Sequence, residues 1–310
     1  MPLIPRMQVF EIDDQTWFPS FLRTYVQSAL TVGWNTSIPI VNTPPASRVA
    51  ASVLLSHLGS RISAYRFLDF CAGAGGPTPM IEAHINAELA ARGQPRVPFV
   101  MTDLHPNVWG WERAVAEAAE RERMRQRAHG GETQVMLSFE SQSVDAAAAP
   151  RDLMQRWTRN GGRVFRLFNL AFHHFDDTLA RRILKNTVET SDGFAIFELQ
   201  DRSFSGFMTL VVLGIGMMLI APFYALKWRA PAVLLFTYVL PILPFVVVFD
   251  GIMSAIRTRT PEEVELLLRT CGAKDAEEGK WIVKSGSIRY VWPFCHFNYV
   301  VCMPEDRQLN

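Results

Sequence analysis

The chain of 310 residues contains few cysteines and carries almost no net charge. Its four cysteines, at positions 71, 271, 295 and 302, form no C-x-x-C pair and have no metal-ligand spacing. They therefore fit a reduced compartment better than a disulfide framework, and we assign no metal ligand. The formal net charge of +1 does not support a broad nucleic-acid footprint, so we expect no nucleic-acid partner.

Targeting signals and repeats are also missing. The segment Met1–Phe10 lacks a long apolar core followed by a cleavage site, so we expect no signal peptide. There is no internal repeat and no low-complexity tract. The length suits one large domain, or one domain that carries an insertion.

The most informative segment is Arg66–Pro79, which reads RFLDFCAGAGGPTP. It predicts a short apolar strand that contains Asp69 and runs into a turn rich in glycine, G-x-G-G, at Gly73, Gly75 and Gly76. A dinucleotide fingerprint would read G-x-G-x-x-G, and a phosphate loop would need Gly-Lys-Ser/Thr. Neither is present, and no Lys or Arg lies between Asp69 and Arg92. The turn therefore suits a ligand without phosphates.

A second acid follows the next predicted strand. Pro98–Thr102 is apolar and is followed directly by Asp103. An acid at this place can accept hydrogen bonds from ribose hydroxyls, while the glycine turn lets the backbone approach the ligand closely. Together the two strand ends indicate a site for an adenosine-containing cofactor.

Strands and helices alternate along the rest of the core. Further strands are expected near Ser138–Asp145, at Arg163–Leu170 and at Phe194–Leu199, and helices at Met80–Arg92, Val108–Ala128 and Asp177–Thr190. Alternation at this length predicts parallel βαβ units in an α/β fold, with ligands bound outside the carboxyl ends of the strands.

The pattern D-x-x-x-G-x-G-G resembles motif I of the class I S-adenosylmethionine-dependent methyltransferases, although Cys71 stands where many members have the first glycine. The resemblance implies a Rossmann-like sheet of seven strands with helices on both faces, closed by an antiparallel pair at Trp281–Val283 and Phe297–Met303. It implies S-adenosyl-L-methionine as cofactor, bound by Asp69, Ala72, Gly73, Gly75, Gly76, Asp103, Leu104, Val144, Asp145 and Asn169. A strand–turn–helix of an α/β protein without cofactor is the alternative.

Two histidines lie where the resemblance places the methyl group. They belong to Ala171–Asp177, AFHHFDD, after the fourth predicted strand. His titrates near neutrality, so His173 or His174 can take a proton from the substrate, with Asp176 or Asp177 orienting it. The alternative is that one histidine caps the next helix and the other packs or faces solvent. The Asn-Pro-Pro-Tyr motif typical of amino-group methylation is absent.

A long apolar stretch interrupts the chain at Ser203–Phe249. Twenty-four uncharged residues separate Arg202 from Lys227, and twenty more follow Arg229. A bilayer core needs about twenty apolar residues per helix, so the stretch predicts a membrane hairpin that turns at Lys227–Arg229. Prolines at 222, 231, 241 and 244 would kink it, which leaves a shallow re-entrant hairpin open. A buried core hairpin is the other alternative.

These expectations divide the chain into four parts. They are an amino-terminal helical cap or lid (1–60), the cofactor-binding α/β core (61–202), the hydrophobic hairpin (203–249) and a carboxyl-terminal part that completes the sheet (250–310). In the cap, helices are expected from about Pro19 and over Ser47–Leu58. In the last part, Thr260, Pro261 and Glu263 predict a capping box at a helix start.

The sequence therefore favours a membrane-associated methyltransferase with its catalytic domain on the cytoplasmic side. Its expected substrate is a lipophilic small molecule of lipid or secondary metabolism, methylated at oxygen, which could reach the site from the bilayer. Two alternatives stay open. One is a methyltransferase-like protein that acts as a cyclase, isomerase or cofactor-binding scaffold, and the other is an α/β domain that serves only as an anchor or partner-binding module.

Overall fold

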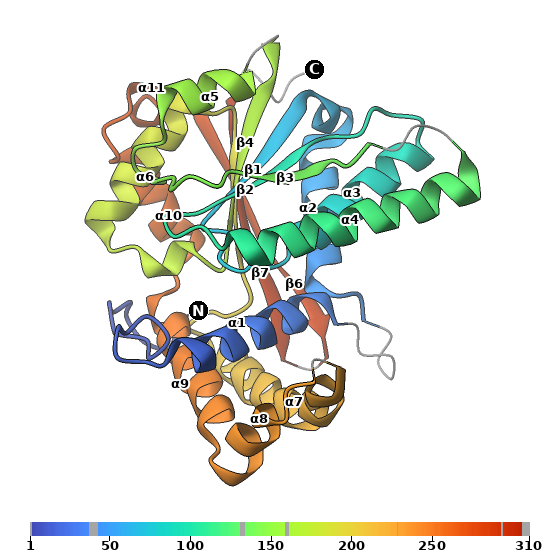
Figure 1. Cartoon of the computed structure of the whole chain (residues 1–310). Helices are drawn as coiled ribbons and strands as arrows, with labels where there is room; N and C mark the ends of the chain where they lie inside the picture. The colour runs from blue at the N-terminus through green and yellow to red at the C-terminus, as the bar shows by residue number, and fades with distance from the viewer. Residues whose placement is uncertain are drawn as a thin grey trace.

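The computed structural model describes residues 2–36, 43–130, 134–158, 161–227, 229–292 and 294–305. Its centre is a seven-stranded sheet in the order β3-β2-β1-β4-β5-β7-β6 (Figure 1). The first five strands are parallel, and β7 runs antiparallel to both β5 and β6. The strands are β1 (Tyr65–Phe70), β2 (Phe99–Thr102), β3 (Leu137–Phe139), β4 (Arg163–Asn169), β5 (Phe194–Glu198), β6 (Trp281–Val291) and β7 (Cys295–Pro304).

Helices cover both faces of the sheet. One layer holds α2 (Ala46–Leu58), α3 (Thr78–Ala91) and α4 (Val108–His129), and the other holds α5 (Arg151–Thr158), α6 (Asp177–Thr190), α10 (Pro261–Arg269) and α11 (Lys274–Glu277). Strands β1, β4 and β5 are almost wholly buried, as parallel strands between two helix layers must be. The expected Rossmann-like architecture is confirmed.

Local signals account for several helix ends. The hydroxyl of Thr260 accepts from the backbone N–H of Glu263, whose carboxylate accepts from Thr260 N, so the predicted capping box is present. The carboxylate of Asp176 accepts from Leu179 N at 2.7 Å and begins α6. These caps fix where the helices next to the candidate site begin.

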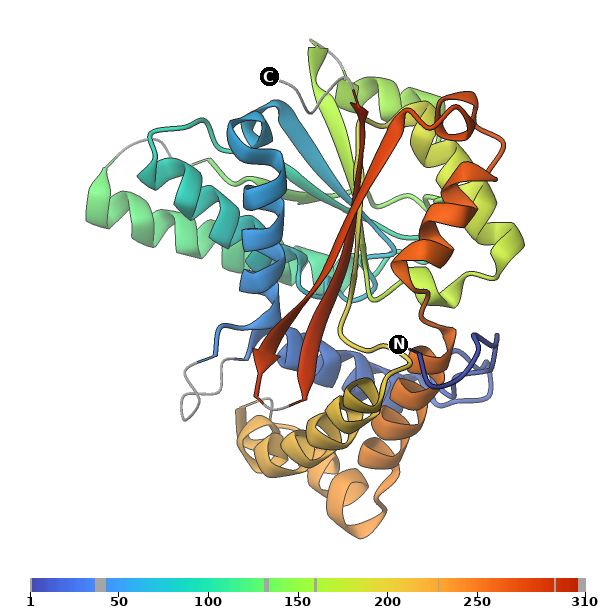
Figure 2. The same ribbon diagram turned by 180° about the vertical axis from the view of Figure 1, so that it is seen from behind.

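Some predicted boundaries were wrong. The third strand covers only Leu137–Phe139, so Val144 and Asp145 lie in the loop after it. The closing strands β6 and β7 are much longer than predicted, because their paired ends extend beyond the sheet towards the apolar helices (Figure 2). There the hydroxyl of Thr209 donates to Phe294 O at 3.2 Å, a contact that sequence periodicity does not signal.

A third group of helices lies beyond the carboxyl edge of the parallel strands. It contains α1 (Ser20–Asn35), α7 (Phe204–Lys227), α8 (Ala232–Leu234), the π-helix η5 (Leu235–Val239) and α9 (Ile242–Arg257). Its core joins Phe18, Leu22 and Val26 to Ala221 and Leu243. The cap helix α1 therefore packs on the apolar stretch as well as on the sheet.

Only the first arm of the expected hairpin is one continuous helix. This arm is α7, whereas the second arm bends by 70° at a break between Val239 and Ile242. Pro241 lies at this break and cannot donate a backbone hydrogen bond, which explains the bend. The predicted turn residue Trp228 lies outside the described residues.

Among the described residues, α7 alone is long and apolar enough to cross a membrane, and the bent second arm passes the same test only if it is taken as one span. Only 28% of the most apolar window of α7 is buried. Several large side chains of this region are more than 60% exposed, namely Phe204, Leu219, Phe223, Leu226 and Val239.

Candidate active site

The glycine turn after β1 adopts the left-handed backbone that its sequence predicts. Gly73, Gly75 and Gly76 have φ values of 52°, 102° and 48°. Cys71 also has a positive φ, 69°, at the position where the methyltransferase motif often has glycine. A side chain at this φ is strained, so Cys71 adopts a backbone conformation that glycine would adopt without strain.

Asp69 is buried at the carboxyl end of β1. Its Oδ2 accepts a hydrogen bond of 2.5 Å from the hydroxyl of Thr78, which in turn accepts from Nδ2 of Asn169 at 3.1 Å. Burial raises the pKa of Asp69 to about 7, and the charge of Asp103 adds to this effect, whereas hydrogen bonds from Thr78 and Asn169 oppose it. Three strand and helix ends thus meet at one buried carboxyl group.

Two acceptor atoms of the side chains around Asp69 have no hydrogen-bond partner among the described residues. They are Oδ1 of Asp69 and Oδ1 of Asn169, and both are buried. Buried acceptors normally have a donor, so this pair marks a place where a donor group of a ligand can bind.

Asp103 follows β2, as predicted, and faces the glycine turn. Its Oδ2 accepts from Gly73 N at 2.9 Å and its Oδ1 accepts from His105 N at 2.8 Å. Trp111 donates from its indole nitrogen to Gly73 O at 2.9 Å, so both backbone polar groups of Gly73 are hydrogen-bonded. A carboxylate offers about four acceptor positions, so Asp103 retains capacity for hydroxyl donors.

The other predicted cofactor residues have different surroundings. Ala72 and Asn169 are buried next to the turn, whereas Leu104 is half-exposed. Val144 is buried and donates from its backbone nitrogen to Asp103 O at 2.9 Å. Asp145 accepts from Ala147 N at 2.8 Å, which holds its own loop. Whether these residues contact a cofactor stays a prediction.

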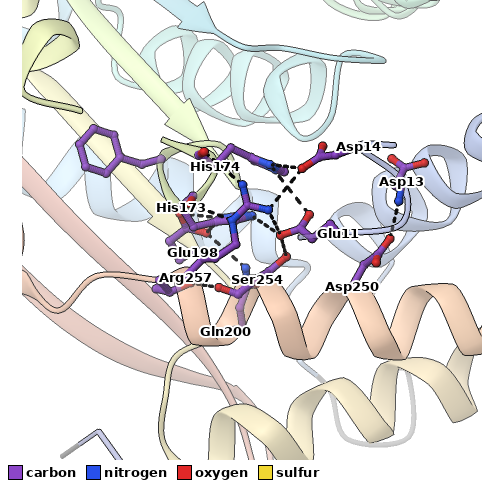
Figure 3. Close-up of polar contacts among 12 residues, drawn as sticks. Glu11, Asp13, Asp14, His173, His174, Glu198, Gln200, Asp250, Ser254 and Arg257 are labelled. Carbon is purple, nitrogen blue, oxygen red and sulfur yellow. Dashed lines mark hydrogen bonds and ion pairs between the residues drawn. The ribbon is translucent and has the colours of Figure 1, made fainter. Parts of the chain in front are cut away.

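His173 and His174 lie in a short 3-10 helix, η4 (Phe172–His174), after β4. Figure 3 shows them within a polar cluster that comes from four separate segments of the chain. His173 is buried and its Nδ1 lies 2.9 Å from Oε2 of Glu198, at the end of β5. The ring of His174 lies beside it, with a centroid distance of 4.3 Å, and its Nδ1 is 3.3 Å from Asp14.

The predicted orienting role of Asp176 or Asp177 was wrong. Asp176 caps α6, and Asp177 pairs with Arg259 at 2.7 Å and with Arg6 at 3.1 Å. Glu198 and Asp14 orient the histidines instead. No local sequence pattern signals this role, because these two acids are distant along the chain from the AFHHFDD motif.

An amino-terminal segment, residues 2–14, closes over the histidines. The carboxylate of Glu11 is buried and contacts Arg257 at 2.9 Å and the hydroxyl of Ser254 at 2.8 Å, both from α9. Gln8 donates to His174 O at 3.1 Å. Asp250 accepts from the backbone nitrogens of Ile12 and Asp13, so it anchors this segment.

The charges of this cluster shift the pKa values of His174 and Asp14 in opposite directions. Burial lowers the pKa of His174, but the hydrogen bond to Asp14 and the charge of Glu11 outweigh it, so the net pKa is raised. Burial raises the pKa of Asp14, yet His174 and Arg257 together lower it to about 2. An ion pair between His174 and Asp14 is thus favoured.

A cavity of about 590 Å³ adjoins this cluster. It is lined by His173 and Glu198, by Ser287 and Asn298 of the sheet, and by Arg202 and Arg259, which precede α7 and follow α9. The residues that lead into α7 and out of α9 therefore border the same cavity.

Comparison with known proteins gives slight similarities only. No family model matches the chain, and no curated protein matches it. A structure of the methyltransferase domain of bacterial CtHen1-CN is 12% identical with a TM-score of 0.42, covering 83% of this chain and 97% of the other. A protein of Rhodobacter sphaeroides provisionally described as a Zn-dependent alcohol dehydrogenase is 12% identical with a TM-score of 0.38 (89% and 96% covered). One of Galdieria sulphuraria, provisionally described as a sarcosine dimethylglycine methyltransferase, is 9% identical with a TM-score of 0.36 (83% and 84%). These values are too low to decide the family or the function.

Proposed function

We propose that this protein is a membrane-associated, S-adenosylmethionine-dependent methyltransferase that acts on a lipophilic small molecule, at oxygen. The observation that carries the proposal is the arrangement at the carboxyl ends of β1, β2 and β4. There a glycine turn with left-handed backbone lies between a buried acid, Asp69, and an acid with free acceptor capacity, Asp103. Ligands of such sheets bind at these strand ends.

The residues present fit the cofactor. The unpartnered oxygens of Asp69 and Asn169 can accept from an ammonium group such as that of the methionine part. The remaining lone pairs of Asp103 can accept from ribose hydroxyls. Bound S-adenosylmethionine would supply a methyl group on a sulfonium, and a positive charge is compatible with a turn that has no Lys or Arg from Asp69 to Ala91.

His173 is the better placed of the two histidines to take a proton from an acceptor hydroxyl. If Nδ1 donates to Glu198, Nε2 is left as the basic nitrogen. Burial keeps water from the ring, and the contact of Glu198 with Nδ1 holds the ring in place. The adjoining cavity gives an acceptor room to approach.

A lipophilic acceptor and a membrane location are supported by the apolar helices. Only 28% of the apolar window of α7 is buried, which differs from the usual core helix of a soluble protein. Because residues just before α7 and just after α9 line the cavity, a substrate dissolved in the bilayer could enter without crossing water. We place the catalytic domain on the cytoplasmic side.

A methyltransferase-like protein that has changed its chemistry, to a cyclase, isomerase or cofactor-binding scaffold, is the second candidate. It is favoured by Cys71, which replaces a glycine of the motif. Burial, together with the charges of Asp103 and Asp69, raises the pKa of the Cys71 thiol, so this residue does not act as a thiolate nucleophile. The mass of the product separates the two candidates, because methyl transfer adds one methyl group.

The first test is calorimetric titration of the detergent-solubilised full chain with S-adenosylmethionine and with S-adenosylhomocysteine. We expect micromolar binding that Asp103→Ala weakens at least tenfold, because the ribose acceptor is lost. Asp152→Ala, an exposed acid of α5, is the matched control and should bind as the wild type does. Absence of binding by the wild type, or equal affinity in Asp103→Ala, would remove the cofactor assignment.

A further inference from the structure

We propose that Glu11, His173 and His174 form a binding site for one divalent transition-metal ion. The three side chains each offer a ligand atom, and these atoms lie within 4.8 Å of one another. Glu11 and His173 are buried and His174 is half-buried, so the ion would lie at the inner end of the amino-terminal segment. The inference does not rest on methyl transfer.

Distances within the cluster fit an ion better than direct hydrogen bonds. Nε2 of His173 is 3.8 Å from Oε1 of Glu11, and Nδ1 of His174 is 3.9 Å from Oε2 of Glu11. Both separations exceed a hydrogen bond. All three ligand atoms lie within 4.8 Å of one another, whereas ligand atoms around a tetrahedral ion with bonds of about 2.1 Å lie roughly 3.4 Å apart, so an ion would draw the three side chains closer together.

The surrounding residues already hold the ligands in a suitable orientation. Glu198 contacts Nδ1 of His173 at 2.9 Å, which directs Nε2 towards Glu11. A carboxylate on the far nitrogen is the usual support of a metal-binding histidine. Ser254 and Arg257 both contact Oε1 of Glu11, and Oε2 is the oxygen that faces His174.

The formal charge of the cluster also favours a cation. Glu11, Asp14 and Glu198 supply three carboxylates, and Arg257 is the guanidinium that contacts Glu11 and Asp14. With His174 neutral, as a ligand of the ion would be, two negative charges remain, and two of the three carboxylates, those of Glu11 and Glu198, are buried, where uncompensated charge is costly. One divalent ion would neutralise them.

The ligand types indicate the class of ion. Two imidazole nitrogens and one carboxylate suit Zn²⁺, Fe²⁺ or Co²⁺, whereas Mg²⁺ and Ca²⁺ prefer oxygen ligands. An ion held through Nε2 of His173 would occupy the lone pair that otherwise takes the substrate proton. With metal bound, the ion itself would acidify an acceptor hydroxyl, and the imidazole would serve as a ligand.

The test is metal binding by the full chain, without affinity tag, in detergent and without S-adenosylmethionine. After dialysis against a chelator, the protein is titrated with Co²⁺, whose visible absorption reports its coordination, and bound Zn²⁺ is counted by mass spectrometry. We expect one equivalent of either ion. Glu11→Gln and His174→Ala should each weaken binding more than tenfold, and Glu198→Gln should weaken it about tenfold to a hundredfold.

His57→Ala, which removes a half-buried histidine of α2, is the matched control and should leave binding unchanged. The half-buried ring of His174 and the near-identical shape of glutamine make folded variants attainable, which thermal unfolding would verify. Stoichiometry below a tenth of an equivalent would overturn the site, as would equal affinity in Glu11→Gln and His174→Ala. Since cofactor titration is a separate measurement, either proposal can fail while the other stands.

Discussion

Gly214 of α7 lies directly against Val248 of α9, so that a Cβ atom on the glycine would be 2.4 Å from Cγ2 of the valine. The contact exists only because position 214 has no side chain. We therefore expect Gly214→Ala to push the two helices apart and to lower the free energy of unfolding by about 1 to 3 kcal/mol. The measurement is the thermal unfolding midpoint in detergent.

Gly216 provides the control on the same helix, because a Cβ there would meet nothing within 4 Å. Gly216→Ala should be neutral or stabilise the helix by up to about 1 kcal/mol. The second change Val248→Ala should rescue Gly214→Ala, since it removes the clashing methyl group. Equal midpoints for the two glycine variants would show that α7 and α9 do not pack this closely.

A second prediction concerns Cys71, the strained residue at the start of the glycine turn. Cys71 has a φ of 69°, which costs a residue with a side chain roughly 1 kcal/mol. Cys71→Gly should relieve this strain and leave stability equal or raised by up to about 1 kcal/mol, whereas Cys71→Ala keeps the strain and loses the packing of the sulfur. Thermal unfolding should rank glycine above alanine, and the reverse order would contradict the strained geometry.

A third prediction follows from the raised pKa of Asp69, about 7. Between pH 4 and pH 7 the folded protein holds a proton on Asp69 that the unfolded chain has released. This contribution to stability therefore falls as the pH rises through that window, by at most about 4 kcal/mol. In Asp69→Asn the contribution is absent, so its unfolding midpoint should decline less with pH than that of the wild type.

Asp152→Asn, which changes an exposed acid, should keep the wild-type pH profile of the unfolding midpoint. If Asp69→Asn and the wild type gave parallel profiles from pH 4 to 7, the carboxyl group of Asp69 would not be titrating as a buried acid. Cofactor affinity measured on the same variant would report separately on the proposed ammonium contact.

A fourth prediction tests the membrane proposal without disturbing the fold. Leu219 and Leu226 are 76% and 81% exposed, so aspartate at both positions should be tolerated in the folded protein. Each charge placed in the hydrocarbon costs about 2.5 to 3.5 kcal/mol, so the pair should weaken binding to neutral phosphatidylcholine vesicles more than a hundredfold. Vesicle flotation is the measurement.

The matched control places the same charges on exposed apolar residues of the α/β core. Leu266 of α10 and Met124 of α4 are 61% and 58% exposed, and their replacement by aspartate should leave flotation unchanged. A wild-type protein that does not float with vesicles would rule out the membrane surface, and so would a double variant of α7 that floats as well as the wild type.

Much of the fold could be predicted because its signals are local. The glycine turn, the acid after β2, the capping box at Thr260 and the alternation of apolar strands with helices each depend on residues close together in sequence. The long ends of β6 and β7 could not be predicted in this way. Their extra residues are half-exposed and are held by each other and by α7, which no periodicity records.

The candidate site likewise contains residues that local sequence signals predict and residues that only tertiary contacts bring to it. The histidines were found because they follow β4 directly, whereas Glu198, Arg257 and above all Glu11 were missed. Glu11 belongs to an acidic stretch that would be expected on the surface, and only its tertiary contact with α9 brings it to His173. Distances between segments, not motifs, define this part of the site.

The closure of the amino-terminal segment has a consequence for how the protein is made. Leu3 donates to Arg202 O, and Glu11 contacts Ser254 and Arg257, so this segment binds partners that are synthesised roughly two hundred residues or more after it. Likewise, β7 is translated after the other six strands of the sheet and fills the space between β5 and β6. A nascent chain that stops before β7 has neither a closed sheet nor an edge protected from pairing with other chains. The polar cluster around His173 can therefore be completed only after α9, the last of its four segments along the chain, has been synthesised.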